Sequence, residues 1–158
     1  MSKYELDFFV SWEELHKAGR RLAKRLNEIQ KWEGILAVTR GGMVPTAIIA
    51  RELNIRLIDT ICVSSYDGQK RGGLTLNKFP ELPRGGKNWL IIDDLVDTGK
   101  TAAEVRSRFP NAHFATIYAK PAGIEYVDSY VEEVTQGTWI RFPWDITLSY
   151  SDPIIEGG

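Results

Sequence analysis

Apolar residues near the amino terminus recur at helical spacing, and the rest of the chain has short apolar runs between polar turns. Residues 11–28 carry the helical pattern, with Ser11 at its start and Glu14 three residues later. This is the arrangement of a capping box, in which two side chains satisfy the free N–H groups at a helix start. The apolar residues on the predicted inner face are Leu15, Leu22, Leu26 and Ile29. We therefore predict a scaffold helix that continues to about Glu28.

The short apolar runs predict strands that alternate with helices. The predicted strands are 34–39, 56–65, 89–94, 112–119 and 130–134, and the predicted helices between them are 44–53 and 102–109. Alternation of this kind is typical of a parallel sheet with right-handed crossovers. A chain of 158 residues is long enough for one such unit. We therefore predict a single α/β domain over residues 1–158, with a mostly parallel central sheet flanked by helices.

Residues 66–87 interrupt this pattern with glycines, prolines and charged residues. The stretch is too long for an ordinary connection in a small domain. One interpretation is a mobile lid, because a reaction that passes through a carbocation-like state needs water to be excluded. A plain surface loop is the alternative that composition leaves open.

Composition excludes some classes of function. The 20 Lys and Arg residues nearly balance the 21 Asp and Glu residues, for a net charge of -1. We therefore expect no nucleic-acid partner, and any site for a polyanion must be local. No stretch approaches the length of a transmembrane segment, and the amino terminus lacks the apolar core of a signal peptide. The expected location is cytoplasmic.

Residues 90–101 carry the clearest chemical signal in the chain. An apolar strand ends there in Asp93 and Asp94, and in a parallel sheet this end opens onto the ligand crevice. Adjacent carboxylates at such a place need a cation or hydroxyl donors, and ribose hydroxyls beside a metal supply both. Residues 97–101 then place a glycine and two threonines before the predicted helix, whose first amides face an anion. The stretch therefore predicts a ribose-phosphate site.

Two other interpretations of this stretch are weaker. Gly99-Lys100-Thr101 also matches the end of the P-loop of nucleotide hydrolases, but the first glycine of that motif would fall at Asp94. A carboxylate inside a triphosphate cradle is electrostatically unfavourable. An acidic, solvated loop is the other alternative, and three aspartates with two threonines in register are more than such a loop needs.

A second turn with glycines follows the strand predicted at 34–39. Its glycines, Gly41 and Gly42, let backbone amides approach a phosphate, and Arg40 offers a fixed fork of donors. This turn is therefore a candidate for pyrophosphate binding. An ordinary turn before the next helix is the alternative.

Residues 91–101 resemble the signature sequence of the type I phosphoribosyltransferases, enzymes that use phosphoribosyl pyrophosphate (PRPP). Further segments resemble the bacterial xanthine-guanine phosphoribosyltransferases of this family, and they are 39–45, 64–67, 118–122 and 138–145. In order and spacing the similarity covers nearly the whole chain. It implies the type I phosphoribosyltransferase fold, with a small hood from the C-terminal segment and a lid at roughly 66–87.

The resemblance implies an enzyme of purine salvage that uses Mg²⁺ and transfers the 5-phosphoribosyl group of PRPP to guanine, xanthine or hypoxanthine. The products would be GMP, XMP or IMP and pyrophosphate. The alternatives are a phosphoribosyltransferase for another nucleobase and a non-catalytic PRPP-sensing regulator, and the presence of Asp97 disfavours the regulator. The family also suggests a homotetramer. Some members associate loosely with membranes, so the alternative to a purely cytoplasmic location is a peripheral one at the inner membrane.

The resemblance also implies a role for each matching residue. The residues expected to bind PRPP are Arg40, Gly41, Asp93, Asp94, Asp97, Thr98, Gly99, Lys100 and Thr101. Within this set, Asp94 is the expected magnesium contact and Asp97 the catalytic acid-base group. Lys100 stands where the xanthine-guanine enzymes have glycine, so the role of its side chain is left open. The peptide bond that enters Arg40 is expected to be cis.

The purine site is expected to consist of Asp97, Lys120, Trp139 and Ile140. By resemblance, Lys120 reads the 6-oxo group, Trp139 stacks on the ring, and the Ile140 backbone reads the ring edge. The alternatives are a core position for Trp139 and an exposed strand-end position for Lys120. The lid is expected to begin at Ser65 and Tyr66, with Arg71 in contact with a ligand phosphate or a neighbouring subunit.

Overall fold

The computed structural model describes residues 5–65, 73–145 and 153–155. The helices are α1 (Trp12–Ile29), α2 (Met43–Glu52) and α3 (Lys100–Arg108). The strands are β1 (Leu6–Phe9), β2 (Gly34–Thr39), β3 (Ile58–Ser65), β4 (Leu74–Lys78), β5 (Trp89–Val96), β6 (His113–Ala119), β7 (Ser129–Glu133) and β8 (Thr138–Arg141). A turn with left-handed backbones covers Pro83–Gly86, and a 3₁₀ helix covers Ile124–Tyr126. Within the described ranges, no helix has the length and apolar character needed to cross a membrane.

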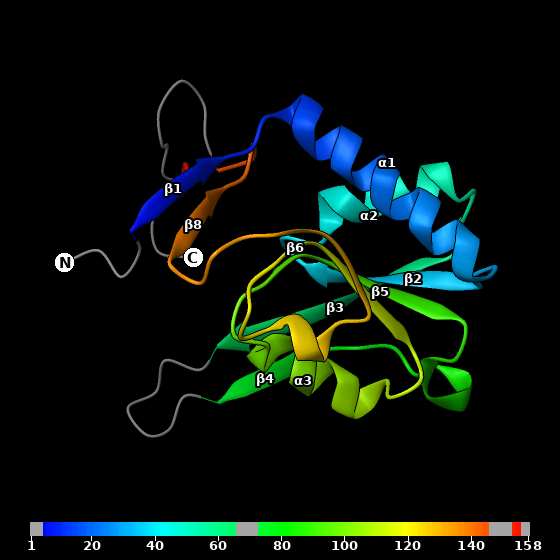
Figure 1. Cartoon of the computed structure of the whole chain (residues 1–158). Helices are drawn as coiled ribbons and strands as arrows, with labels where there is room; N and C mark the ends of the chain where they lie inside the picture. Colours follow the sequence, from blue (N-terminus) through cyan, green and yellow to red (C-terminus); the bar gives the residue numbers. More distant parts are fainter. Residues whose placement is uncertain (1–4, 66–72, 146–152, 156–158) are drawn as a thin grey trace.

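Six strands form the central sheet in the order β4-β3-β2-β5-β6-β7. All neighbouring pairs are parallel except β3 and β4, which are antiparallel. The predicted α/β domain with a mostly parallel sheet is therefore confirmed. Helices α1 and α2 cover one face of the sheet and α3 covers the other (Figure 1).

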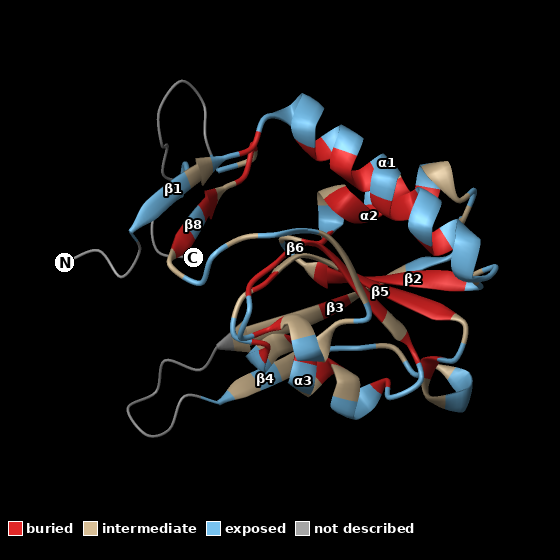
Figure 2. Ribbon diagram, in the orientation of Figure 1, coloured by how far each residue is buried: buried red, intermediate tan, exposed pale blue. Residues whose placement is uncertain are grey.

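The central strands are buried because each face of the sheet has its own apolar core (Figure 2). Leu90 and Ile92 of β5 pack toward α1 and α2, whereas Ile91 packs toward α3. Side chains alternate in this way along any strand. The next two residues, Asp93 and Asp94, are consequently directed to opposite sides of the sheet.

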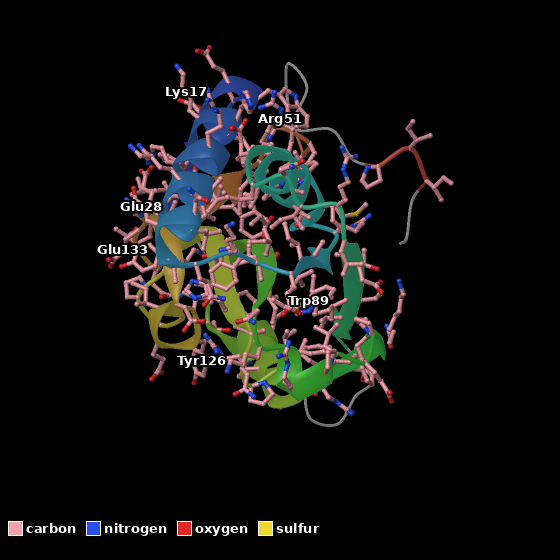
Figure 3. The ribbon with its side chains drawn as sticks, turned by 90° about the vertical axis from the view of Figure 1, so that its right-hand side faces the viewer. Lys17, Glu28, Arg51, Trp89, Tyr126 and Glu133 are labelled. Carbon is pink, nitrogen blue, oxygen red and sulfur yellow. The ribbon has the colours of Figure 1, made fainter. Side chains whose placement is uncertain are left out.

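Helix α1 begins as the sequence predicts. The Glu14 N–H donates to Ser11 Oγ at 3.1 Å, and the Ser11 N–H donates to Glu14 Oε2 at 2.7 Å. Lys17 and Glu28 lie on the outward side of the helix (Figure 3). Ile29, which the pattern places on the inner face, is the last helical residue and is 50% exposed. The buried face consists of Leu15, Ala18, Gly19, Leu22, Ala23 and Leu26.

The hood is a separate two-stranded parallel sheet formed by β1 and β8 (Figure 1). Leu6 pairs with Thr138 at one end, and Arg141 Nε lies 3.4 Å from Asp7 Oδ1. The expected hood from the C-terminal segment therefore also needs a strand from the amino-terminal part of the chain. Phe8 of β1 packs the hood against the central sheet, because its ring lies edge-on to that of Tyr118 in β6 with 5.7 Å between centroids.

Part of the interval 66–87 is built into the fold. Strand β4 lies at the edge of the sheet and pairs with β3, with Leu74 opposite Ser65. Its sequence alternates apolar and polar residues, as an edge strand with one covered face does. The prediction of an irregular segment is therefore wrong for β4. It holds for the turn Pro83–Gly86, where Arg84 and Gly85 have left-handed backbones. Tyr66 and Arg71 lie outside the described residues, and the lid stays a prediction.

Candidate active site at the carboxyl ends of the strands

The predicted site residues lie mainly at the carboxyl ends of β2, β5 and β6. Arg40 and Gly41 follow β2, Asp93 and Asp94 lie near the end of β5, and Lys120 follows β6. Because β5 is the parallel neighbour of both β2 and β6, their carboxyl ends lie side by side. We call this side of the sheet, where the strands end, the active-site edge. The structure thus brings together residues that are up to 80 positions apart in the chain.

A pocket of about 260 Å³ opens at the end of β5. Gly99 has a left-handed backbone (φ 85°), which turns the chain so that α3 begins at Lys100. The first N–H groups of a helix have no partner within it, and those of α3 lie beside this pocket, which can therefore hold a phosphate group. We call it the phosphate pocket. The predicted residues that line it are Asp93, Asp97, Thr98, Gly99, Lys100 and Thr101.

Asp93 and Asp94 divide between two parts of the site. Asp93 lines the phosphate pocket on the α3 side. The Asp94 carboxylate lies so close to Gly41 that a Cβ on Gly41 would overlap it. The Asp94 N–H also donates to Asp93 Oδ1 at 2.9 Å. One carboxylate therefore belongs to the phosphate pocket, and its neighbour contacts the turn after β2.

These carboxylates are electrostatically unfavourable without a partner. Burial raises the pKa of the Asp93 carboxyl well above its ordinary value, and the charge of Asp94 adds to the shift. Burial also raises the pKa of Asp94; hydrogen bonds partly oppose this effect, and the charge of Asp145 strengthens it. Such a site favours a cation or hydroxyl donors. Asp145 is not among the residues predicted from the sequence, and its only signal is its place in the 138–145 motif.

Asp97 has a partner at each carboxylate oxygen. Lys120 Nζ lies 3.3 Å from Asp97 Oδ2, and Gln136 Nε2 donates to Asp97 Oδ1 at 2.7 Å. Lys120 is only 1% exposed, so the alternative of an exposed strand-end lysine is wrong. Gln136 is a further site residue that the sequence does not reveal, because a glutamine in a loop gives no sign of the carboxylate it will contact.

Trp139 and Ile140 occupy opposite faces of β8 in the hood. Ile140 is buried, whereas Trp139 is 40% exposed, so the alternative of a core position for Trp139 is wrong. The Arg141 guanidinium carbon lies 5.5 Å from the centroid of the indole ring, within cation–π range. The accessible part of the indole can stack on a planar ring.

The turn after β2 is shaped by close packing. The Thr39–Arg40 peptide bond is cis, as expected from the resemblance. The Gly42 N–H donates to the Val38 carbonyl oxygen at 2.8 Å, and a Cβ on Gly42 would overlap the carbonyl oxygen of Ile92. Together with the contact between Gly41 and Asp94, this packing explains both glycines. Arg40 is exposed at the same edge.

A mostly parallel sheet with a pocket after β5 and a hood beside the strand ends is the arrangement that the sequence resemblance implies, and comparison with known families agrees. Residues 11–151 match the phosphoribosyl transferase domain. The chain therefore belongs to the phosphoribosyltransferase family. The predicted enzyme class and the type I fold are confirmed.

Individual relatives extend over almost the full chain. The chain is 49% identical over 156 residues to the xanthine-guanine phosphoribosyltransferase of Chromohalobacter salexigens, covering 99% of this chain and 94% of that one. It is 51% identical over 149 residues to the enzyme of the same name from Idiomarina loihiensis, covering 94% and 92%. Among solved structures, a purine phosphoribosyltransferase from Pyrococcus horikoshii is similar with a TM-score of 0.76 and 27% identity, covering 96% of this chain and 99% of that one.

Proposed function

We propose that this enzyme transfers the 5-phosphoribosyl group of PRPP to a 6-oxopurine, with guanine, xanthine and hypoxanthine as the acceptor bases. The products are GMP, XMP or IMP and pyrophosphate, so the reaction is a step of purine salvage. The names of the two relatives support guanine and xanthine as acceptors, and hypoxanthine follows from the chemistry of the 6-position.

The pair formed by Lys120 and Asp97 carries the proposal. A 6-oxopurine presents O6 and N7 side by side on one edge of the ring. Lys120 offers a donor to O6, and Asp97, 3.3 Å away, offers an acceptor to a proton on N7. Adenine would instead turn its 6-amino group toward Lys120, donor against donor. The accessible ring of Trp139 adds a stacking face.

The phosphate pocket is the proposed place of the 5'-phosphate of PRPP. Its donors are the N–H groups at the start of α3 and the hydroxyls of Thr98 and Thr101. Asp93, in the same pocket, accepts from the ribose hydroxyls. Arg40 and the backbone of Gly41 lie at the neighbouring strand end and are the proposed contacts of the pyrophosphate.

In the proposed reaction, a ring nitrogen of the purine forms a bond to the anomeric carbon while the bond from that carbon to pyrophosphate breaks. The electron pair leaves with pyrophosphate, and the sugar develops positive charge in the transition state. Asp97 accepts the proton that the purine sheds as it is alkylated. Donors at Arg40 and Gly41 offset the charge on the leaving group.

Mg²⁺ is the proposed cofactor. The adjacent carboxylates fit a cation, because burial disfavours the charged forms of both, and the charges of Asp94 and Asp145 add to this effect at Asp93 and Asp94, respectively. Carboxylate oxygens are ligands of the kind that Mg²⁺ takes, usually together with substrate phosphates. Asp94 is the proposed protein contact. When bound, the ion supplies charge neutralisation for the leaving pyrophosphate.

A panel of bases tests the proposed function. Pyrophosphate release is measured with PRPP, Mg²⁺ and one base at a time. We expect release with guanine, xanthine and hypoxanthine and little release with adenine. Release with a different base alone would identify a phosphoribosyltransferase for that base. PRPP binding without release with any base would favour the sensing regulator.

A homotetramer is also part of the proposal. Exposed apolar side chains, among them Met43, Leu57 and Ile58, offer surface for contacts between subunits. Sedimentation equilibrium of the purified protein measures the assembly, and a monomer would contradict this part of the proposal. The cytoplasmic location and its peripheral alternative stay predictions.

A further inference from the structure

Gln136 joins three segments of the active-site edge through its side-chain amide. Its Nε2 donates to Asp97 Oδ1 at 2.7 Å and lies 3.4 Å from the Asp97 backbone oxygen. Its Oε1 accepts from the Ala122 N–H at 2.9 Å. One amide therefore connects the loop after β5, the loop after β6 and the loop before β8.

The loop that carries Gln136 continues directly into the hood. The Thr138 N–H donates to the Thr135 carbonyl oxygen at 3.1 Å, and the Oγ1 atoms of the two threonines are 2.7 Å apart. These two bonds close a turn over residues 135–138. Gln136 lies within this turn and Trp139 comes directly after it, so both belong to one short segment that these hydrogen bonds hold in shape.

The contact with Gln136 restricts the orientation of the Asp97 carboxylate. Lys120 and Gln136 each approach a different oxygen. The last torsion of an aspartate side chain is otherwise broad, so donors on both oxygens hold the carboxylate plane in one direction. A carboxylate accepts up to about four hydrogen bonds, which leaves acceptor sites for the substrate. A proton acceptor works only when these sites are within reach of the proton.

We propose that Gln136 is a positioning residue that orients Asp97 toward the purine and ties this orientation to the segment that carries Trp139. The proposal rests on the proposed function, in which Asp97 is the acid-base group. Gln136 is a neutral amide and takes no proton itself. It does not line the phosphate pocket itself, so we expect it to influence turnover far more than the binding of PRPP.

Two variants separate the two hydrogen bonds of the amide. Gln136→Glu keeps an acceptor for the Ala122 N–H but replaces the donor to Asp97 with a second carboxylate, whereas Gln136→Met loses both bonds at similar side-chain length. The parental kcat in either variant would overturn the proposal. We expect both variants to lower kcat about tenfold, which corresponds to about 1.4 kcal/mol, with a much smaller change in the KM for PRPP.

A double-mutant cycle with Asp97→Asn tests whether the effect passes through Asp97. We expect Gln136→Met to have little further effect on kcat in the Asp97→Asn background, and an undiminished effect there would overturn the proposal. Gln30→Met is the matched control. Gln30 also donates a surface hydrogen bond, to Asn88 Oδ1 at 3.3 Å, but these residues lie in the segments that lead into β2 and β5, at the side of the sheet opposite the active-site edge. It should keep the parental kcat.

A second measurement does not need turnover. The side-chain NH₂ resonances of Gln136 in the NMR spectrum should shift in Asp97→Asn, and unshifted resonances would overturn the proposal. The kinetic cycle uses the base on which the parent enzyme is fastest, so an error in the base assignment does not affect it. A parent enzyme that is inactive with every base would overturn the proposed function instead.

Discussion

The ring of Tyr126 lies against Gly99, the residue from which the chain turns into α3. The contact is so close that a Cβ on Gly99 would overlap the ring. The Tyr126 carbonyl oxygen accepts from Arg106 Nε at 2.6 Å, and Arg106 also pairs with Asp128. Because Arg106 belongs to α3, this helix and the 3₁₀ helix Ile124–Tyr126 brace each other beside the phosphate pocket.

Gly99→Ala is expected to weaken PRPP binding. A left-handed backbone costs a residue with a side chain about 1 to 2 kcal/mol, and the new methyl group also meets the Tyr126 ring. Calorimetric titration with PRPP should show a loss of about tenfold or more. Tyr126→Ala introduced together with Gly99→Ala should recover part of the affinity. Equal affinities of the single and double variants would show that the ring has no influence.

Asp97→Asn should lower turnover far more than PRPP affinity. The shape of the side chain is kept, but the charge that stabilises the transferred proton is lost, at a cost of roughly 10²-fold in kcat. Steady-state kinetics with PRPP and guanine measure the effect. Asp59→Asn is the control, because Asp59 also pairs with a lysine, Lys78 at 3.2 Å, but near the amino end of β3. Near-normal turnover of the Asp97 variant would remove this residue from the mechanism.

Thr101→Val should weaken the binding of both PRPP and the product nucleotide. The change conserves volume and deletes one hydroxyl donor from the phosphate pocket. We expect a loss of about 1.5 to 3 kcal/mol of binding free energy, the range for a hydrogen bond to a charged group. Calorimetry measures both affinities, and an unchanged value would place the 5'-phosphate outside this pocket.

Lys120→Gln should reduce the discrimination between 6-oxopurines and adenine. Glutamine offers both a donor and an acceptor, whereas the lysine ammonium only donates. Activity with guanine, xanthine and hypoxanthine should fall while their advantage over adenine narrows. The measurement is the ratio of kcat/KM for hypoxanthine and adenine, since sites that hydrogen-bond a substrate group can discriminate by up to about 10⁴-fold. A ratio equal to that of the parent would show that Lys120 does not read the 6-position.

His113 should make the folded state less stable below neutral pH. Burial lowers the pKa of the imidazole below 6.5, with the charge of Asp128 opposing the shift and that of Arg106 adding to it. The unfolded chain therefore binds more protons as the pH falls below about 6.5, and the free energy of unfolding decreases. His113→Gln should flatten this dependence in chemical unfolding measured at a series of pH values. An unchanged slope would assign the dependence to other groups.

Local patterns in the sequence by themselves determined several elements and the main part of the site. Helix α1 with its capping box and β2 with its bounds follow from periodicity and from contacts between residues a few positions apart. The phosphate pocket follows from a buried strand that ends in carboxylates and is succeeded by Gly99 and a helix start. Such features depend on neighbouring residues, so one sequence is enough to predict them. The proposed roles of Lys120 and Trp139 came from the family resemblance.

Only the tertiary structure decided which distant residues meet. Strands β1 and β8 have four residues each, too few for a clear pattern, and they form the hood by pairing across the length of the chain. The pleat of β5 separated Asp93 from Asp94, and the packing of three loops brought Gln136 to Asp97. Each of these contacts requires long segments of chain to close onto two apolar cores. Their free energy therefore depends on the whole fold, and no local pattern encodes it.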